Sequence, residues 1–379
     1  MSAICQFLYQ STPMMIGDVA ISNFESQNQD TVAIPTRQAG NEPFPSGSGF
    51  IITELTQKIV RLTPDFVLGW ANSYIHARFF ARELRAFLLH KQREINEIMR
   101  YLNEFDPSVI SKLELLGIIY RDNTIFTFGI NATSVCDLMT REPERFIGSG
   151  GELLYKDVAW LKTKGHNAYE SVGTSNPLNE HFSRCNGLIS NLLRKEMTDS
   201  TGFHHYYGGG YELCGFNHQT AFEKFSGTTF AFWDLTAIES SKNKYDIYIK
   251  PIHMTRYFYV GDILTIKALH LGRVDGNKIE ISSGNVFHIR PLLADNSPSL
   301  PDDFNLESNV VCNLISIYVN NFNKPFGTIS ANTFMNDKNA AIQMNQVGKN
   351  TIEFKINNDE LLRVTTDFIA GIPESLKRK

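Results

Sequence analysis

Three residues near the start of the chain have types and positions that could hydrolyse an amide bond: Ser2, Asp18 and Lys58. Ser2 directly follows the initiator Met1, and removal of Met1 would give it a free α-amine beside its own hydroxyl. An α-amine has a pKa of about 7.7 to 8, so near neutral pH part of it is unprotonated and can accept the hydroxyl proton. The hydroxyl could then attack an amide carbonyl and form an acyl-enzyme that water cleaves.

Asp18 and Lys58 would supply the charges that this chemistry needs. An ammonium group at Lys58 would favour the neutral amine and the ionised hydroxyl, and Asp18 would hold that ammonium in place. The same two residues could equally form a structural ion pair at a sheet edge, with Ser2 an ordinary second residue of an edge strand. Both interpretations stay open from the residues alone.

The periodicity of the chain predicts paired strands and paired helices that would position these residues. The predicted strands before residue 240 form hairpins over 2–18, 58–71 and 113–130, followed by strands at 211–216 and 228–235. Helical periodicity covers 73–105, 152–161 and 180–198. Residues 27–49 are rich in proline and glycine and predict a long loop.

The resulting order, ββ, ββ, αα, ββ, αα, ββ, indicates two facing sheets covered on the outside by helix pairs. From about Ser240 onward no helical periodicity is evident, and strand-like runs occupy 245–252, 257–266, 278–289, 310–319 and 351–356. We therefore expect an α+β fold: a four-layer αββα sandwich over residues 1–238, followed by a separate all-β domain over 239–379.

Over residues 2–236 the chain resembles the proteasome β-subunit group of N-terminal nucleophile (Ntn) hydrolases. In that family a nucleophile opens the first strand, an aspartate closes the second and a lysine opens the third, and Ser2, Asp18 and Lys58 occupy those positions. The Gly-Ser-Gly-Gly sequence at 148–151 is similar to a loop beside the family's nucleophile. Residues 199–202 resemble its supporting Asp-x-x-Ser-Gly element.

The resemblance implies roles for further residues. Ser149, Asp199 and Thr201 would support the nucleophile, by hydrogen-bonding the amine or relaying a proton. Gly148, Gly150 and Asn72 would contribute to the oxyanion and substrate site. Asn72 stands where the family usually has glycine, and asparagine is among the better-tolerated residues at positive φ.

By the same resemblance, the chain would be a peptidase or amidohydrolase that acts on a peptide or amide and forms a homo-oligomer. The alternative is a catalytically inactive proteasome-like scaffold or assembly protein, whose C-terminal β-domain binds a partner. The sequence holds no support for an ATP-dependent unfoldase as partner.

The composition of the chain narrows the classes of partner, cellular location and cofactor that we expect. Lys and Arg number 36 against 40 Asp and Glu, a net charge of −4, so we expect neither a nucleic acid nor a membrane partner. Five scattered cysteines lack metal-type spacing and predict reduced, buried thiols in a cytoplasmic protein. We interpret His204, His205 and the three glycines at 208–210 as a loop, and expect neither a metal nor a cofactor.

Overall fold

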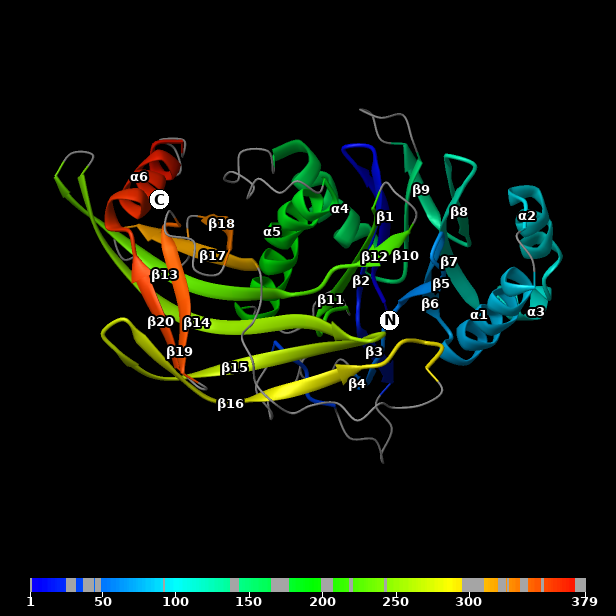
Figure 1. The fold of residues 1–379 in the computed structure, drawn as a ribbon, viewed down its shortest axis with the longest axis horizontal. Helices are drawn as coiled ribbons and strands as arrows, with labels where there is room; N and C mark the ends of the chain where they lie inside the picture. Colours follow the sequence, from blue (N-terminus) through cyan, green and yellow to red (C-terminus); the bar gives the residue numbers. More distant parts are fainter. Residues whose placement is uncertain are drawn as a thin grey trace.

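The computed structural model describes residues 2–24, 32–36, 44, 49–90, 93–136, 143–164, 177–198, 207–217, 221–241, 244–294, 310–319, 325, 327–334, 340–348 and 351–371. Helices and strands are mixed along the chain, and most of the regular structure lies in sheets (Figure 1). Most of the predicted loop at 27–49 lies outside the described residues, as do Met1, Asp199, Thr201, His204 and His205.

The first sheet has six strands and contains the start of the chain. Its order is β12-β11-β2-β1-β10-β9, and neighbouring strands are antiparallel throughout. The strands are β1 (Ile4–Tyr9), β2 (Thr12–Asp18), β9 (Thr133–Cys136), β10 (Pro143–Ile147), β11 (Tyr211–Phe216) and β12 (Phe222–Lys224). The predicted hairpin over 2–18 is confirmed, because β1 and β2 pair along their whole length.

The second sheet has four strands in the order β5-β6-β7-β8. They are β5 (Ile59–Thr63), β6 (Phe66–Asn72), β7 (Leu113–Arg121) and β8 (Thr124–Ile130), so the predicted hairpins over 58–71 and 113–130 are confirmed. Its side chains alternate between two cores, as the two-residue period of a strand requires. Val60 and Leu62 face the helices, whereas Ile59 and Val67 join Ile4 of β1 in a core between the two sheets.

Each of these two sheets shares a buried core with helices. The helices α1 (Tyr74–Leu89), α2 (Ile95–Glu104) and α3 (Pro107–Ile110) share one core with the four-stranded sheet. The helices α4 (Gly151–Lys164) and α5 (Pro177–Thr198) share another with the six-stranded sheet. A short two-stranded sheet of β3 (Ala20–Phe24) and β4 (Phe50–Leu55) continues the chain after β2.

The C-terminal part is dominated by an eight-stranded sheet in the order β18-β17-β13-β14-β15-β16-β20-β19, with β13 and β17 parallel. Its strands are β13 (Thr228–Ser241), β14 (Lys244–Val260), β15 (Ile263–Asp275), β16 (Lys278–Ile289), β17 (Val310–Val319), β18 (Gly327–Phe334), β19 (Ile342–Gly348) and β20 (Thr351–Ile356). In Figure 1 the long strands β13 to β16 extend from the region around β3 and β4 toward the C-terminal helix.

Three predictions about this part were wrong. The all-β expectation missed α6 (Asn358–Gly371), whose apolar residues at Leu361, Val364 and Ile369 are buried against the sheet. The strand predicted at 257–266 is instead the end of β14, a turn at Gly261 with φ +60°, and the start of β15. Glycine adopts that φ readily, which allows the chain to reverse inside an apolar run.

The strand predicted at 228–235 was expected within the sandwich of residues 1–238, but it belongs to the eight-stranded sheet. It forms the first half of β13, and Thr228 pairs with Tyr257 of β14 and Val310 of β17 instead of with the six-stranded sheet. The expected boundary between residues 238 and 239 therefore falls inside one continuous strand. One buried core also contains residues of β1 and α5 together with Phe230 and Leu314 of the large sheet. The division into two domains stays a prediction.

Candidate functional site

The centre of the candidate site is a buried ion pair between Asp18, at the end of β2, and Lys58, just before β5. Both side chains have 0% exposure, and Lys58 Nζ lies 2.7 Å from Asp18 Oδ1. The ammonium also donates to the Ala20 carbonyl at 2.5 Å. Burial lowers the pKa of Lys58, and the charge of Asp18 opposes that change. The ammonium is therefore held by two oxygens in a site from which water is excluded.

Ser2 is tied to this pair through the residue that follows it. The Ala3 N–H donates to Asp18 Oδ1 at 2.8 Å, and the Asp18 N–H donates back to the Ala3 carbonyl at 3.0 Å. A single carboxylate oxygen thus contacts both Lys58 and the backbone next to Ser2. Ser2 itself is 5% exposed. The structure brings together the three residues that the sequence singled out, and their catalytic roles stay a prediction.

The glycine-rich sequence between β10 and α4 lies directly against Ser2. The Gly150 N–H donates to the Ser2 carbonyl at 3.0 Å. Gly148 has φ +84°, and a Cβ built on it would lie 2.1 Å from the Ser2 oxygen, which leaves no room for any side chain. Ser149, between them, is exposed. The loop therefore lies beside Ser2, as the sequence predicted, and the Ser149 side chain is exposed to solvent.

Asn72 ends β6 and has φ +77°, a conformation that only a few non-glycine residues adopt. Its side-chain amide donates to Glu114 Oε1 at 3.1 Å, and Glu114 Oε2 accepts the Gly148 N–H at 2.6 Å. Glu114 therefore joins the predicted oxyanion residue to the loop against Ser2. Sequence reasoning missed Glu114, whose only signal is one acidic residue near the start of an otherwise apolar strand.

The segment that contacts the second oxygen of Asp18 is the glycine run before β11. The Gly208 N–H donates to Asp18 Oδ2 at 3.1 Å, and the Ala20 N–H donates to the Gly208 carbonyl at 3.0 Å. The sequence predicted only a loop here and assigned this supporting role to residues 199–202. Asp199 and Thr201 lie outside the described residues, so their roles stay predictions.

A buried glutamate near the end of α5 holds the other side of this glycine run. Glu196 Oε2 accepts from the Thr36 hydroxyl at 2.8 Å and from the Gly209 N–H at 3.2 Å, and Glu196 Oε1 accepts from the Tyr211 hydroxyl at 2.5 Å. Burial raises the pKa of Glu196 to about 7, against the opposing effect of these three hydrogen bonds. Asp18 and Glu196 thus bind successive N–H groups of one turn.

A second buried carboxylate fixes the start of β5. Glu212 Oε1 accepts from the backbone N–H groups of Lys58 and, at 2.7 Å, Ile59. Its other oxygen lies 3.0 Å from Lys224 Nζ. Burial raises the pKa of Glu212, and Lys224 opposes that change. Glu212 sets the backbone from which the Lys58 side chain extends, and nothing local in the strand sequence indicates that role.

The described residues contain no group of three or more His, Cys, Asp or Glu side chains arranged to hold a metal ion. Among the helices in the described ranges, none combines the length and apolar character that a membrane crossing requires. Four of the five cysteines are buried and Cys136 is exposed.

Comparison with known proteins gives a similarity of fold to solved structures. No known protein family model matches the chain, and no curated protein matches it. Among solved structures, the chain is similar to eukaryotic HslV from Trypanosoma brucei, with 15% sequence identity and a TM-score of 0.32 over 57% of this chain and 99% of that chain. This is a distant likeness of fold and carries no argument about function. The assignment below depends on the contacts around Asp18 and Lys58.

Proposed function

We propose that this chain is an N-terminal nucleophile hydrolase that cleaves a peptide or other amide bond, with Ser2 as nucleophile after removal of Met1. The observation that carries the proposal is the fully buried Asp18–Lys58 pair beside the Ser2 backbone. Burying two charges costs several kcal/mol per ion before their attraction and hydrogen bonds offset it. Ionisable groups with perturbed pKa values cluster at functional sites, and the Lys58 pKa is lowered.

The proposed reaction uses the groups in a fixed order. The α-amine of Ser2 takes the proton of the Ser2 hydroxyl as the hydroxyl oxygen bonds to the substrate carbonyl carbon. The carbon–nitrogen bond of the amide then breaks, the leaving amine takes that proton, and an ester to Ser2 remains. Water, activated by the same α-amine, attacks the ester and releases the acid. Lys58 favours the neutral amine through its positive charge, and Asp18 holds Lys58.

The proposal gives the residues around the pair supporting roles. The backbone at Asn72, with its positive φ, and the loop of Gly148 and Gly150 would line the oxyanion and substrate position. Ser149, exposed on that loop, would contact substrate or the amine. Asp199 and Thr201 would support the amine from the segment after α5.

The wider architecture belongs to the same proposal. We propose that helices and sheets up to β12 form the four-layer αββα sandwich of Ntn hydrolases, with the large sheet as an added domain. A homo-oligomer through the helix layers would cover the apolar side chains of Ile75 and Phe79 on α1, which are 76% and 49% exposed. Sedimentation that gave only a monomer would contradict the oligomer.

Hydrolysis of a panel of fluorogenic peptide amides by the purified chain tests the proposal, with Ser2→Ala and Ser2→Thr as variants. All three residues are small, so each permits removal of Met1, and intact mass verifies that removal. We expect loss of hydrolysis in Ser2→Ala and retention of measurable hydrolysis in Ser2→Thr, which keeps a hydroxyl beside the amine. Equal hydrolysis by wild type and Ser2→Ala would refute the nucleophile. A chain without activity and with Met1 retained would favour the scaffold alternative.

A further inference from the structure

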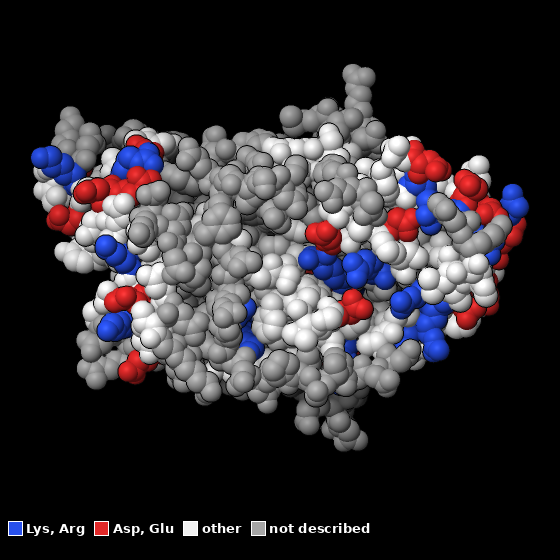
Figure 2. Space-filling view, viewed as in Figure 1, with Lys and Arg blue, Asp and Glu red and all other residues white. Residues whose placement is uncertain are grey.

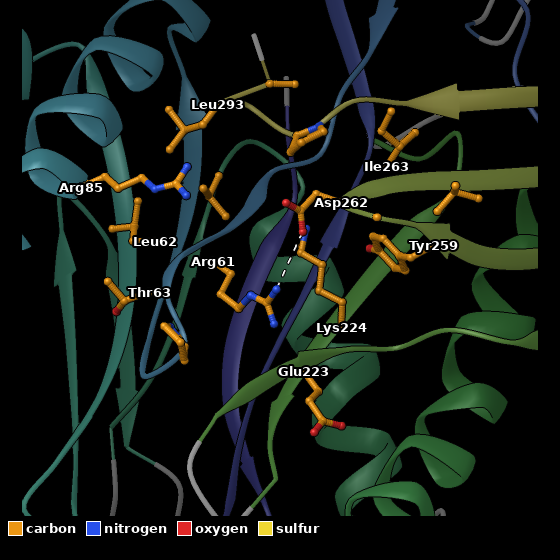
Figure 3. A pocket seen from close by; sticks show the side chains of 16 residues that line it. Arg61, Leu62, Thr63, Arg85, Glu223, Lys224, Tyr259, Asp262, Ile263 and Leu293 are labelled. Atoms are coloured by element: carbon orange, nitrogen blue, oxygen red, sulfur yellow. Dashed lines mark ion pairs between the residues drawn. The ribbon is translucent and has the colours of Figure 1, made fainter. Parts of the chain in front are cut away.

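A pocket of about 710 Å³ lies along β5, and none of Ser2, Asp18 and Lys58 lines it (Figure 3). One wall is formed by five consecutive residues of the chain at 60–64. The other walls come from α1, β12, the turn between β14 and β15, and residues 291–294. Figure 2 shows basic and acidic side chains gathered near the middle of this face, close to the positions of β5 and β12 in Figure 1.

The wall at β5 is the free edge of the four-stranded sheet. The Lys58 carbonyl accepts the Trp70 N–H and so points toward β6, whereas the Lys58 N–H donates to Glu212. The next residue, Ile59, directs its N–H away from β6, toward Glu212. Because backbone groups alternate sides along a strand and the register with β6 is regular from Ile59 to Arg61, the Arg61 N–H also points to the outer edge; the register shifts between Arg61 and Thr63.

This edge is occupied at its two ends and open between them. Glu212 binds the Ile59 N–H at one end, and the Pro64 carbonyl accepts the Phe222 N–H at 2.7 Å at the other. Among the turn, loop and side-chain hydrogen bonds of the described residues, none involves the Arg61 N–H. An open strand edge is a template for an added strand, because its main-chain groups are one half of a ladder.

Two guanidinium groups flank the open edge on opposite faces of the sheet. Arg61 Nη1 donates to the Phe222 carbonyl at 3.4 Å, on the side of β12. Arg85 extends from α1, on the face that packs against Val60 and Leu62. In Figure 3 both side chains lie along the β5 wall of the pocket. Successive side chains of an added strand alternate between two faces, so neighbouring residues would meet Arg85 and Arg61 in turn.

The other charges near the pocket leave these two guanidinium groups available. The Lys224 ammonium is already bound by Glu212 and Gln57. The one acidic partner of Arg61 among the described residues is Asp262, at 3.8 Å, and their side chains are 45% and 81% exposed. Exposed ion pairs of this kind contribute about 0 to 1 kcal/mol to the stability of a protein. The carboxylate of a bound ligand can therefore replace Asp262 as the partner of Arg61. Guanidinium forks match carboxylates in geometry as well as in charge.

We propose that this pocket binds an extended peptide segment of a partner protein, with two neighbouring acidic side chains, as an added strand on β5. The main chain of the segment pairs with Arg61, and its acidic side chains contact Arg61 and Arg85. The apolar side chains of Ile263 and Leu293 in the pocket wall accept the flanking residues. This binding does not depend on the proposed hydrolase chemistry.

Fluorescence anisotropy of the full chain with a labelled, C-terminally amidated peptide, Val-Thr-Glu-Glu-Val-Thr, tests the proposal. We expect saturable binding that weakens about three- to tenfold in Arg61→Gln and in Arg85→Gln, and also as salt is raised. Arg82→Gln, an exposed residue of α1 that does not line this pocket, is the matched control and keeps full binding. Ser2→Ala also keeps full binding, which separates this test from the hydrolase test.

Two further peptides test the strand itself, each N-methylated at alternate residues so that one edge of the peptide loses its N–H donors. We expect one of the two to lose binding and the other to keep it, because only one edge faces β5. The proposal is overturned by equal binding of both peptides, by unchanged binding in Arg61→Gln and Arg85→Gln, or by no saturation at about 1 mM. Displacement of the peptide by an equal concentration of glutarate would also overturn it, because the pocket would then recognise carboxylates without a strand.

Discussion

Replacement of Glu196 by glutamine should change how the stability of the chain depends on pH. The Glu196 carboxyl has a pKa of about 7 in the folded chain, against about 4.5 without the fold. As pH rises from 4.5, the unfolded chain releases this proton first, so the free energy of unfolding falls until pH passes about 7 and is then level. Each pH unit between the two values costs about 1.4 kcal/mol, so the loss between pH 5 and pH 8 is roughly 2 to 3 kcal/mol.

A glutamine side chain does not titrate, so it removes this pH-dependent loss of unfolding free energy, and it can keep the hydrogen bonds that Glu196 makes. Its oxygen can accept from Thr36 and Gly209, and its NH₂ can donate to the Tyr211 hydroxyl, which rotates to accept. In urea unfolding at pH 5, 6, 7 and 8, the unfolding free energy of Glu196→Gln relative to wild type should therefore rise by roughly 2 to 3 kcal/mol between pH 5 and pH 8. The exposed residue Glu104 offers a control, because Glu104→Gln should stay parallel to wild type. Parallel curves for wild type and Glu196→Gln would refute the account of the buried carboxyl.

Three other substitutions test the site. Lys58→Met should lower the unfolding free energy, measured in urea, by about 3 to 5 kcal/mol, because it leaves the Asp18 carboxylate buried without its cation. Adding Asp18→Asn to the same chain should recover part of that loss. Gly148→Ala should abolish amide hydrolysis, since a Cβ there meets the Ser2 carbonyl at 2.1 Å; unchanged hydrolysis would show that the loop is not part of the site. Asn72→Ala should lower the unfolding free energy by about 1 kcal/mol relative to Asn72→Gly, because alanine tolerates φ +77° poorly, and equal melting temperatures would contradict that strain.

The elements around the site could be predicted because their signals are local. The strands at 59–63 and 66–72 alternate between two apolar cores, and the turn between them contains Pro64. Asp18 and Lys58 could be proposed because their positions at strand ends match those of the family that the chain resembles. The contact between them is long-range, because β2 belongs to the six-stranded sheet and β5 to the four-stranded sheet, and the 2.7 Å ion pair joins residues at the ends of these two strands.

What the sequence could not indicate depends on distant partners. Glu114, Glu196 and Glu212 look like ordinary acidic residues within apolar elements, and their roles come from backbone N–H groups elsewhere in the fold. The strand at 228–235 has the same alternation in either sheet, so only its partners decide its place. The α6 helix follows a run of strands and was missed, although Leu361, Val364, Phe368 and Ile369 repeat at helical spacing.

The most direct test of the central claim is the chemical state and reactivity of residue 2. Incubation of the chain with a peptide β-lactone, which acylates hydroxyl nucleophiles, followed by mass spectrometry of the N-terminal peptide, measures both at once. The account predicts a peptide that begins at Ser2 and carries one acyl group on the serine hydroxyl, with no acylation of the same peptide in Ser2→Ala. An N-terminal peptide that retains Met1, or one that begins at Ser2 and stays unmodified while other residues react, would contradict it.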